Sequence, residues 1–484
     1  MQPFDFRLTT RRVLGLAVYL TATACGTIGR AVAPSGPECG IEGLGAVPVV
    51  RVQASDAPPG KIWLYQCASP IQVSSTQAAL FVNVREALAQ GVDFEVGNDV
   101  VVFGGLDEIA TATPVVANRN HTEPNPNAGG QAATMVKYPI RGGFVPLGAK
   151  RRDGTPHPHA GTGFGLSLAQ AWKTLQSGPP PYLQNSYAGA EAHGYLEFQQ
   201  FEFDGRRFSV THTDRVPFGK LLEGWHISNG GLTNALADGD DLLVAMVGKS
   251  QQRDRERFSG SGILRFRRDG RRWRPVSFDP VPQLAHTIEP SLVRDLDGRL
   301  LASARGSGDR RHNVCIVRSD DGGRTWSDLI QVDDLIGAGP ITLNQAADGT
   351  LYIAANLRRT MPGPRDPLTL LAASRKTAVE PATNNRNTLA IWPVSQDRRS
   401  LLEPQEVLDC RAAFGPPAGS NWTWRADHAS GMTVRLADGQ WHHLLGFRVQ
   451  DYREIKEAMP PTSRTGMYVH EIRSVGPAQP TWSF

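Results

Sequence analysis

The sequence predicts an all-β protein made of repeated small sheets, a β-propeller of about six blades. Glycine (50 residues) and proline (35 residues) are frequent in this chain of 484 residues, so turns should be many and long helices few. Apolar segments with strand-like alternation recur on both sides of Asp-Gly dipeptides. Hairpins repeated in groups of about four strands are typical of propeller blades.

Each repeat begins with an apolar strand, an Asp-Gly turn and a second apolar strand, and a third strand follows. Glycine suits the turn because it adopts positive φ without a Cβ clash. Four copies fit well, a fifth fits less well and a sixth is plausible; in that order they span Gly231–Val276, Glu289–Leu329, Pro340–Ser395, Gly431–Ile472, Gly142–Val210 and Val47–Phe103. The polar, Asn/Pro-rich stretch 104–133 is expected to be a long loop.

The N-terminus has the features of an export signal. Arg11 and Arg12 precede the short apolar run 13–20, and small residues at 22–24 precede Cys25. This arrangement resembles a bacterial lipobox, although Ala22 stands where leucine is usual. We therefore expect a signal peptide over residues 1–24, a linker over 25–44 and the propeller over 45–484. Cys25 would be the first mature residue and a lipidated membrane tether, with plain secretion as the alternative.

Export implies a periplasmic, outer-membrane-attached or extracellular protein. The formal net charge is only +4, which argues against nucleic acid as the main partner, because nucleic-acid binding requires clustered positive charge. We expect a monomer without a cofactor. Four further cysteines allow disulfides in an exported protein, with free thiols as the alternative, and their connectivity stays open: Cys39, Cys67, Cys315 and Cys410. No Cys-x-x-Cys pair occurs, so no metal site is expected.

One short motif identifies a family. Residues 319–326 (SDDGGRTW) match the Asp-box, Ser-x-Asp-x-Gly-x-Thr-Trp, at all five defined positions: Ser319, Asp321, Gly323, Thr325 and Trp326. The serine and aspartate side chains would cap backbone N–H groups, the glycine would take positive φ, and the tryptophan would pack on a neighbouring strand. These roles are structural. With its repeats, the chain resembles the bacterial sialidases, a BNR-repeat family, and the resemblance implies a six-bladed β-propeller of sialidase type.

The resemblance also implies a site. In sialidases a glutamate opens the inner strand of one blade and an arginine closes the second strand, and Glu289 and Arg305 match this pair. Arginine pairs with carboxylates through two parallel hydrogen bonds, so Arg305 would hold the carboxylate of an acidic sugar. Sialidases use a tyrosine nucleophile, because a carboxylate would be repelled by that sugar. Glu289 would take the tyrosine's proton, as in an exo-α-sialidase-like glycoside hydrolase.

The remaining family positions match less well. The Arg-Ile-Pro motif of the first clamp is missing, and Arg141 is the nearest candidate. The fifth blade has Asn356 at the position equivalent to Arg305, with Arg358 and Arg359 as displaced alternatives. Tyr452 is the candidate nucleophile, with Tyr468 as an alternative.

Other polar residues are expected near the channel, where a sugar could bind: His157 and His159 on a second strand, and the others on inner strands or their entry loops. We assign substrate-binding roles to His157, His159, His226, Arg425 and His428, and a catalytic role to Asp427. The tryptophans at 422 and 424 could stack on a sugar. Three functions therefore stay open. They are a sialidase-type hydrolase, with sialic acid or another terminal sugar as substrate; another carbohydrate-active enzyme that uses Asp427, His428 and the other histidines for acid–base work; and a non-catalytic glycan- or protein-binding propeller.

Overall fold

The structure is a computed structural model, and the chain divides into two units, residues 1–38 and 39–484. The described residues all belong to the second unit: 41–42, 49–51, 57–87, 95–124, 132–174, 183–187, 194–251, 258–306, 314–332, 339–357, 386–415, 424–451, 464–474 and 476–478. The expected signal peptide, Cys25, Cys39 and Tyr452 lie outside these residues. Cys67 and Cys410 are free and buried.

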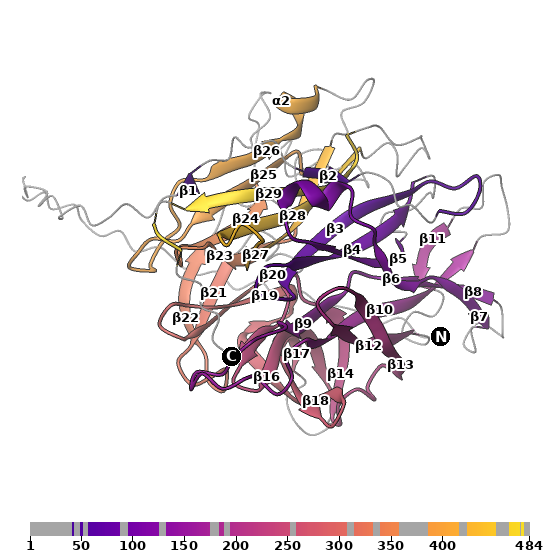
Figure 1. The fold of residues 1–484 in the computed structure, drawn as a ribbon, viewed down its shortest axis with the longest axis horizontal. Helices are drawn as coiled ribbons and strands as arrows, with labels where there is room; N and C mark the ends of the chain where they lie inside the picture. Colours follow the sequence, from indigo (N-terminus) through magenta and orange to yellow (C-terminus); the bar gives the residue numbers. More distant parts are fainter. Residues whose placement is uncertain are drawn as a thin grey trace, which may run out of the picture. The chain divides into compact units, whose positions relative to one another are not determined.

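The described strands form six antiparallel sheets, which are the six blades of a propeller (Figure 1). The first blade contains β3 (Trp63–Gln72), β4 (Ala78–Glu86), β5 (Glu95–Phe103) and β6 (Val115–Arg119). The second contains β7 (His121–Pro124), β8 (Ala132–Lys137), β9 (Arg141–Val145), β10 (Thr162–Thr174), β11 (Leu183–Tyr187), β12 (Gly194–Phe203) and β13 (Phe208–Pro217). The third contains β14 (Trp225–Gly230), β15 (Leu236–Asp238), β16 (Asp241–Ser250), β17 (Ser259–Asp269) and β18 (Arg272–Ala285).

The last three blades follow the same plan. The fourth contains β19 (Thr287–Arg294), β20 (Leu300–Gly306), β21 (Val314–Ser319) and β22 (Ser327–Val332). The fifth contains β23 (Thr342–Gln345), β24 (Leu351–Asn356), β25 (Thr388–Pro393) and β26 (Gln405–Asp409). The sixth contains β27 (Trp424–Arg435), β28 (Trp441–Asp451) and β29 (Gly466–Ser474), with β1 (Ile41–Glu42) and β2 (Val49–Arg51) paired to β29. Two short helices, η1 (Leu106–Ala110) and α2 (Cys410–Phe414), complete the described elements.

The innermost strands contact one another in cyclic order and enclose a central channel. Strand β3 contacts β9, β9 contacts β15, β15 contacts β19, and the ring continues through β23 and β27 back to β3. The ring is closed by the N-terminal strands, which share the sixth sheet with the C-terminal strand β29. This arrangement confirms the all-β, six-bladed propeller predicted from the repeats.

The prediction of a long loop over residues 104–133 was wrong. It contains η1, the outer strand β6 and the edge strand β7. Both strands are polar and half-exposed because they lie at sheet edges, so their sequences carry little apolar alternation.

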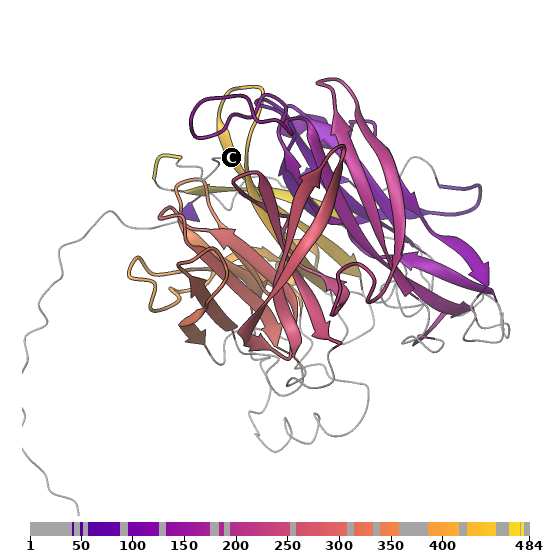
Figure 2. The same ribbon diagram turned by 90° about the horizontal axis from the view of Figure 1, so that it is seen from below.

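Apolar side chains fill the space between neighbouring blades. Phe164 of β10 stacks on Phe266 of β17 with ring centroids 3.9 Å apart, and Trp273 of β18 lies beside both. Figure 2 shows the long strands β10, β12 and β13, in purple to magenta, running side by side in the second sheet. Full burial of such a ring contributes about 1.5–3 kcal/mol. Such packing therefore stabilises the contact between the second and third blades.

Candidate functional site

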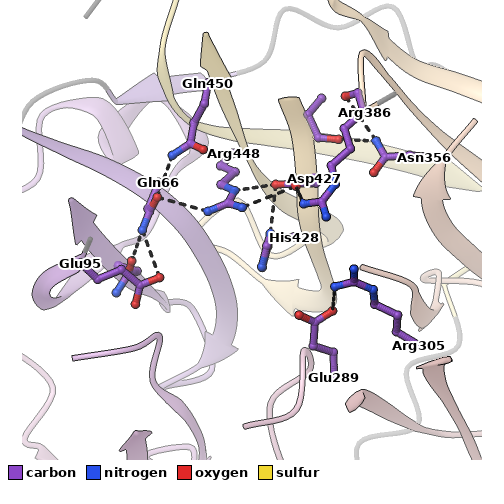
Figure 3. A network of polar contacts seen from close by, with 12 residues as sticks. Gln66, Glu95, Glu289, Arg305, Asn356, Arg386, Asp427, His428, Arg448 and Gln450 are labelled. Atoms are coloured by element: carbon purple, nitrogen blue, oxygen red, sulfur yellow. Dashed lines mark hydrogen bonds and ion pairs between the residues drawn. The ribbon is translucent and has the colours of Figure 1, made fainter. Parts of the chain in front are cut away.

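Three inner strands carry the same irregularity at their entry halves. In β3, β19 and β27 two residues oppose a single residue of the next strand, which is a β-bulge. The first bulge residue is Gln66 in the first blade, Glu289 in the fourth and His428 in the sixth. Bulges re-aim side chains. Gln66 and His428 belong to one network of polar contacts through Arg448 and Asp427, and the Glu289–Arg305 pair lies beside that network (Figure 3). We call this end of the channel the polar mouth, defined by Gln66, Arg141, Glu289, Arg305, Arg386, Asp427, His428 and Arg448.

Two of these bulge residues have unusual backbones. Glu289 has φ of 54° and His428 has φ of 55°, in the left-handed region that non-glycine residues rarely adopt. Such conformations cost of order 1–3 kcal/mol each and persist where the surrounding structure enforces them. Both strained residues therefore lie at matching positions of the fourth and sixth blades.

The predicted pair of the fourth blade is formed. Arg305 Nη1 donates to Glu289 Oε2 over 3.0 Å, and each side chain is 18% exposed. The pair is thus accessible from the channel. Within the described part of the chain, Arg305 Nε is buried and has no hydrogen-bond partner. Arg305 therefore keeps donors for a further anionic group.

The side chain of Asp427 is buried completely among cations. Its Oδ1 accepts hydrogen bonds from Arg448 Nε at 2.5 Å and His428 Nδ1 at 3.0 Å, and its Oδ2 accepts one from Arg386. Burial by itself would raise the pKa of Asp427, but Arg448, His428 and Arg386 outweigh burial and hold the pKa well below its usual range. Asp427 is a permanent anion that ties the fifth blade to the sixth.

The first and second blades complete the polar mouth. Gln66 donates to Glu95 over 3.3 Å and accepts from Gln450 over 2.9 Å. Arg141 opens β9 and is buried; its Nε donates to the Gly231 carbonyl over 2.9 Å. Burial lowers the pKa of Arg141, and the nearby acidic groups that oppose this include Glu289. The arginine selected from the second blade thus lies within electrostatic range of Glu289.

Two arginines of the polar mouth escaped the sequence analysis. Asn356 does occupy the position equivalent to Arg305, but its amide donates to backbone carbonyls. The fifth blade instead supplies Arg386, two residues before the start of β25. Arg448 pairs with Asp427 in the register as Arg305 pairs with Ile288. Counting the same number of residues from the turn glycine as for Arg305 does not reach Arg448, because β27 and β28 are longer on the side of the turn. The pairing of β27 with β28 identifies Arg448 directly.

The histidines of the second and third blades lie in two places. His157 approaches Asp240, in the turn after β15, at 3.4 Å, and His159 packs edge-on against Trp273 with centroids 5.7 Å apart. This turn lies at the opposite end of the blade from the polar mouth. His226 lies near the start of β14, with its ring 5.2 Å from that of Phe218. Only His226 of the three is therefore at the entry end of an inner strand.

Two further candidates lie on β27. Arg425 is buried and precedes Asp427 by two residues, so it belongs to the same face of the strand. Trp424 packs against Phe414 in the core and is 4% exposed, so the expectation that it stacks on a sugar was wrong.

The Asp-box forms the turn between β21 and β22, on the outer part of the fourth blade. Asp321 accepts from the backbone N–H groups of Arg324 and Thr325 and from the Thr325 hydroxyl. Gly323 has φ of 95°, and Trp326 Nε1 donates to its carbonyl over 3.0 Å. The hydrogen bonds to Thr325, then that from Ser319, hold the pKa of Asp321 below its usual range.

The other end of the channel is different. A cavity there is bounded mainly by apolar side chains of the inner strands, including Ile71, Phe144, Leu292 and Met432. Among the described residues, no group of three His, Cys, Asp or Glu could hold a metal ion. No helix in the described part of the chain is long and apolar enough to cross a membrane.

Comparisons with known proteins agree with this architecture. Residues 204–383 match the family model of the BNR repeat-like domain. A protein of unknown function from Dyadobacter fermentans DSM 18053 is similar, with 13% identity, a TM-score of 0.50 and coverage of 88% of this chain and 97% of that one. The chain is thus a six-bladed β-propeller, and residues 204–383 of it are similar to a BNR repeat-like domain.

Two sialidases are also similar in structure. The Trypanosoma rangeli sialidase in complex with sialic acid has 11% identity and a TM-score of 0.47; 91% of this chain and 59% of that chain are covered. A mutant of NanB sialidase from Streptococcus pneumoniae has 10% identity and a TM-score of 0.45; 87% of this chain and 70% of that chain are covered. No curated protein sequence matches the chain. Identities this low carry no conclusion about the chemistry of this chain, which is argued from its own site.

Proposed function

We propose that this protein is a glycoside hydrolase of sialidase type that acts on a carboxylate-bearing terminal sugar at the polar mouth. The observation that supports this most is the Glu289–Arg305 pair. Both side chains are partly exposed to the channel and lie 3.0 Å apart, on the two strands where the family places its glutamate and arginine. Either sialic acid or another acidic sugar fits this chemistry.

The charges of the polar mouth favour an anionic ligand. The polar mouth has four guanidinium groups, those of Arg141, Arg305, Arg386 and Arg448, and two carboxylates, those of Glu289 and Asp427. Glu95, which accepts a hydrogen bond from Gln66 beside them, is a third carboxylate, so one positive charge is in excess. Arg386 and Arg448 are committed to Asp427. The Arg305 side chain is partly exposed, and among the described residues Nη2 makes no hydrogen bond, so the guanidinium group can bind a sugar carboxylate beside Glu289.

Glu289 would take up the proton of the attacking nucleophile. In sialidases that nucleophile is a tyrosine, and within the described residues no tyrosine hydroxyl makes a hydrogen bond to Glu289. Tyr452 remains our candidate. A second function is favoured by the Asp427–His428 hydrogen bond: another carbohydrate-active enzyme on this fold, in which an imidazole carries out acid–base work.

The test compares two variants of the pair with a matched surface pair. Glu289→Gln should abolish turnover of an aryl sialoside or aryl glucuronide with little change in melting temperature. Arg305→Lys should weaken binding of these acidic substrates but spare a neutral aryl glycoside, because lysine keeps the charge and loses the two-pronged geometry. The controls are Arg299→Lys and Asp320→Asn, an exposed ion pair of 2.9 Å. Full activity of Glu289→Gln would contradict the proposal. A purely structural pair would instead lower the melting temperature and spare activity.

Export is a separate proposal. The basic pair, apolar run and small residues before Cys25 support cleavage at that residue and lipidation of its thiol. Mass spectrometry of the mature N-terminus tests this, and a mature chain that starts well downstream of Cys25 would contradict lipidation.

A further inference from the structure

We propose that His428 is a proton-transferring catalytic residue of this site and that Asp427 is its positioning residue. This inference rests on the proposed function. It reverses the roles expected from the sequence, where Asp427 was assigned to catalysis and His428 to substrate binding. It also fills the acid–base position that no motif in the sequence could supply.

Asp427 cannot exchange protons in this arrangement. Its side chain is 0% exposed, and both oxygens accept hydrogen bonds from cationic or imidazole groups. Protonation would remove the counter-charge of two arginines that are themselves buried, so it is strongly disfavoured. A carboxylate held in this way orients its neighbours and stays ionised.

His428 has the opposite properties. Its side chain is 18% exposed, and Nδ1 is fixed by Asp427 at 3.0 Å. A hydrogen on Nδ1 leaves a lone pair on Nε2, and Nε2 makes no hydrogen bond within the described chain. Figure 3 shows the ring between Asp427 and the Glu289–Arg305 pair. The free nitrogen is therefore presented on the side of the channel where the sugar would bind.

The matching bulges support a functional role. His428 and Glu289 are the first bulge residues of the sixth and fourth blades, and their φ angles of 55° and 54° are nearly the same. Neither residue is glycine, which would adopt this conformation without strain. Two strained polar residues at one level of one channel are the pattern found where strain serves a site.

The charged surroundings keep the imidazole neutral. Burial, followed by Arg448, lowers the pKa of His428, while Asp427 and Glu289 act in the opposite direction. Arg386 from the fifth blade and Arg305 from the fourth complete the charged groups around it. Neutral His428 can accept a proton on Nε2 at physiological pH.

Hydrolysis takes place in two halves, and Glu289 and His428 each carry one proton. In the first half, the nucleophile's oxygen bonds to the anomeric carbon, its proton passes to Glu289, and the leaving oxygen departs with its electron pair and takes a proton from solvent. In the second half, water bonds to the anomeric carbon and gives its proton to His428 Nε2. The nucleophile's oxygen then leaves with its electron pair and recovers the proton from Glu289, and the imidazolium releases its proton to solvent.

The deciding variant is His428→Gln, measured with an activated aryl sialoside and an aryl glucuronide. We expect kcat to fall by about 10²-fold or more, KM to fall with it so that kcat/KM changes little, and a burst of aryl release to precede the slow steady state, because only the water step is impaired. His428→Gly should recover turnover with added imidazole. His442→Gln, on β28 beside the β27–β28 turn and so at the end of the strand away from the polar mouth, is the matched control and should behave as wild type.

Asp427→Asn gives an independent readout. The loss of a carboxylate that raises the pKa of His428 should move the acid limb of the pH–rate profile to lower pH. If that variant does not fold, the His428 variants still decide. Wild-type turnover with an inactive Glu289→Gln and a fully active His428→Gln would overturn this inference alone. Inactivity of the wild type on both acidic substrates would count against the proposed function and would remove this inference with it.

Discussion

Replacement of Asp427 by asparagine should destabilise the propeller substantially. The change keeps the size of the side chain and one acceptor oxygen, but removes the charge that Arg448 and Arg386 share. The Arg448 side chain is 1% exposed and that of Arg386 is 9% exposed, so water cannot replace the lost partner. Removing one member of a buried ion pair typically costs 3–5 kcal/mol, and because asparagine still accepts a hydrogen bond we expect about 3 kcal/mol.

The assay is equilibrium unfolding in guanidinium chloride at several pH values. Since the folded pKa of Asp427 lies below its unfolded value of about 3.9, its contribution is fully present above that pH and is lost as the pH falls through the folded pKa. The gap between wild type and variant should therefore be constant near neutrality and should narrow below about pH 3.9. Asp320→Asn, in exposed ion pairs, is the control and should cost at most about 1 kcal/mol. A loss below about 1 kcal/mol in Asp427→Asn would refute the reasoning.

Three further predictions concern the scaffold. Gly231→Ala should destabilise by about 1–3 kcal/mol in chemical unfolding, because its Cβ would lie 2.2 Å from the Ala245 carbonyl oxygen, whereas Gly230→Ala meets only Arg141 Cγ at 3.7 Å and should be tolerated. Burial lowers the pKa of His443 to about 3, so between about pH 6.5 and pH 3 only the unfolded chain binds a proton at this residue. The free energy of unfolding should therefore fall by about 1.4 kcal/mol for each unit by which the pH is lowered in this range, and His443→Gln should remove that dependence. Asp321→Asn should lower the melting temperature at neutral pH, lose this effect in strong acid, and leave turnover unchanged, because the Asp-box lies on the outer part of its blade.

The sequence by itself determined the features that depend on one hairpin. Asp-Gly turns with flanking apolar alternation predicted the blades, because a tight turn and the two strands beside it are local. The same locality placed Glu289 and Arg305 together: the strand leaving the turn at 297–298 must run back along the strand entering it, and the register pairs Ile288 with Arg305. The Asp-box could be read for the same reason, since the side-chain hydrogen bonds of Ser319 and Asp321 lie within residues 319–326.

Only the tertiary structure decided which groups of different blades meet in the channel. The Arg386–Asp427 contact joins the fifth and sixth blades, and the contact from Arg141 to the Gly231 carbonyl joins the second and third. These contacts between blades depend on how the inner strands pack around the ring and on where each strand bulges. Neither the packing nor the bulges leave a periodic signal in the sequence. Residue type alone could not tell which of Asp427 and His428 transfers the proton and which one positions the other. Hydrogen bonds from Arg386, His428 and Arg448 outweigh burial and keep Asp427 an anion, and a bulge left His428 with an Nε2 that makes no hydrogen bond within the described chain.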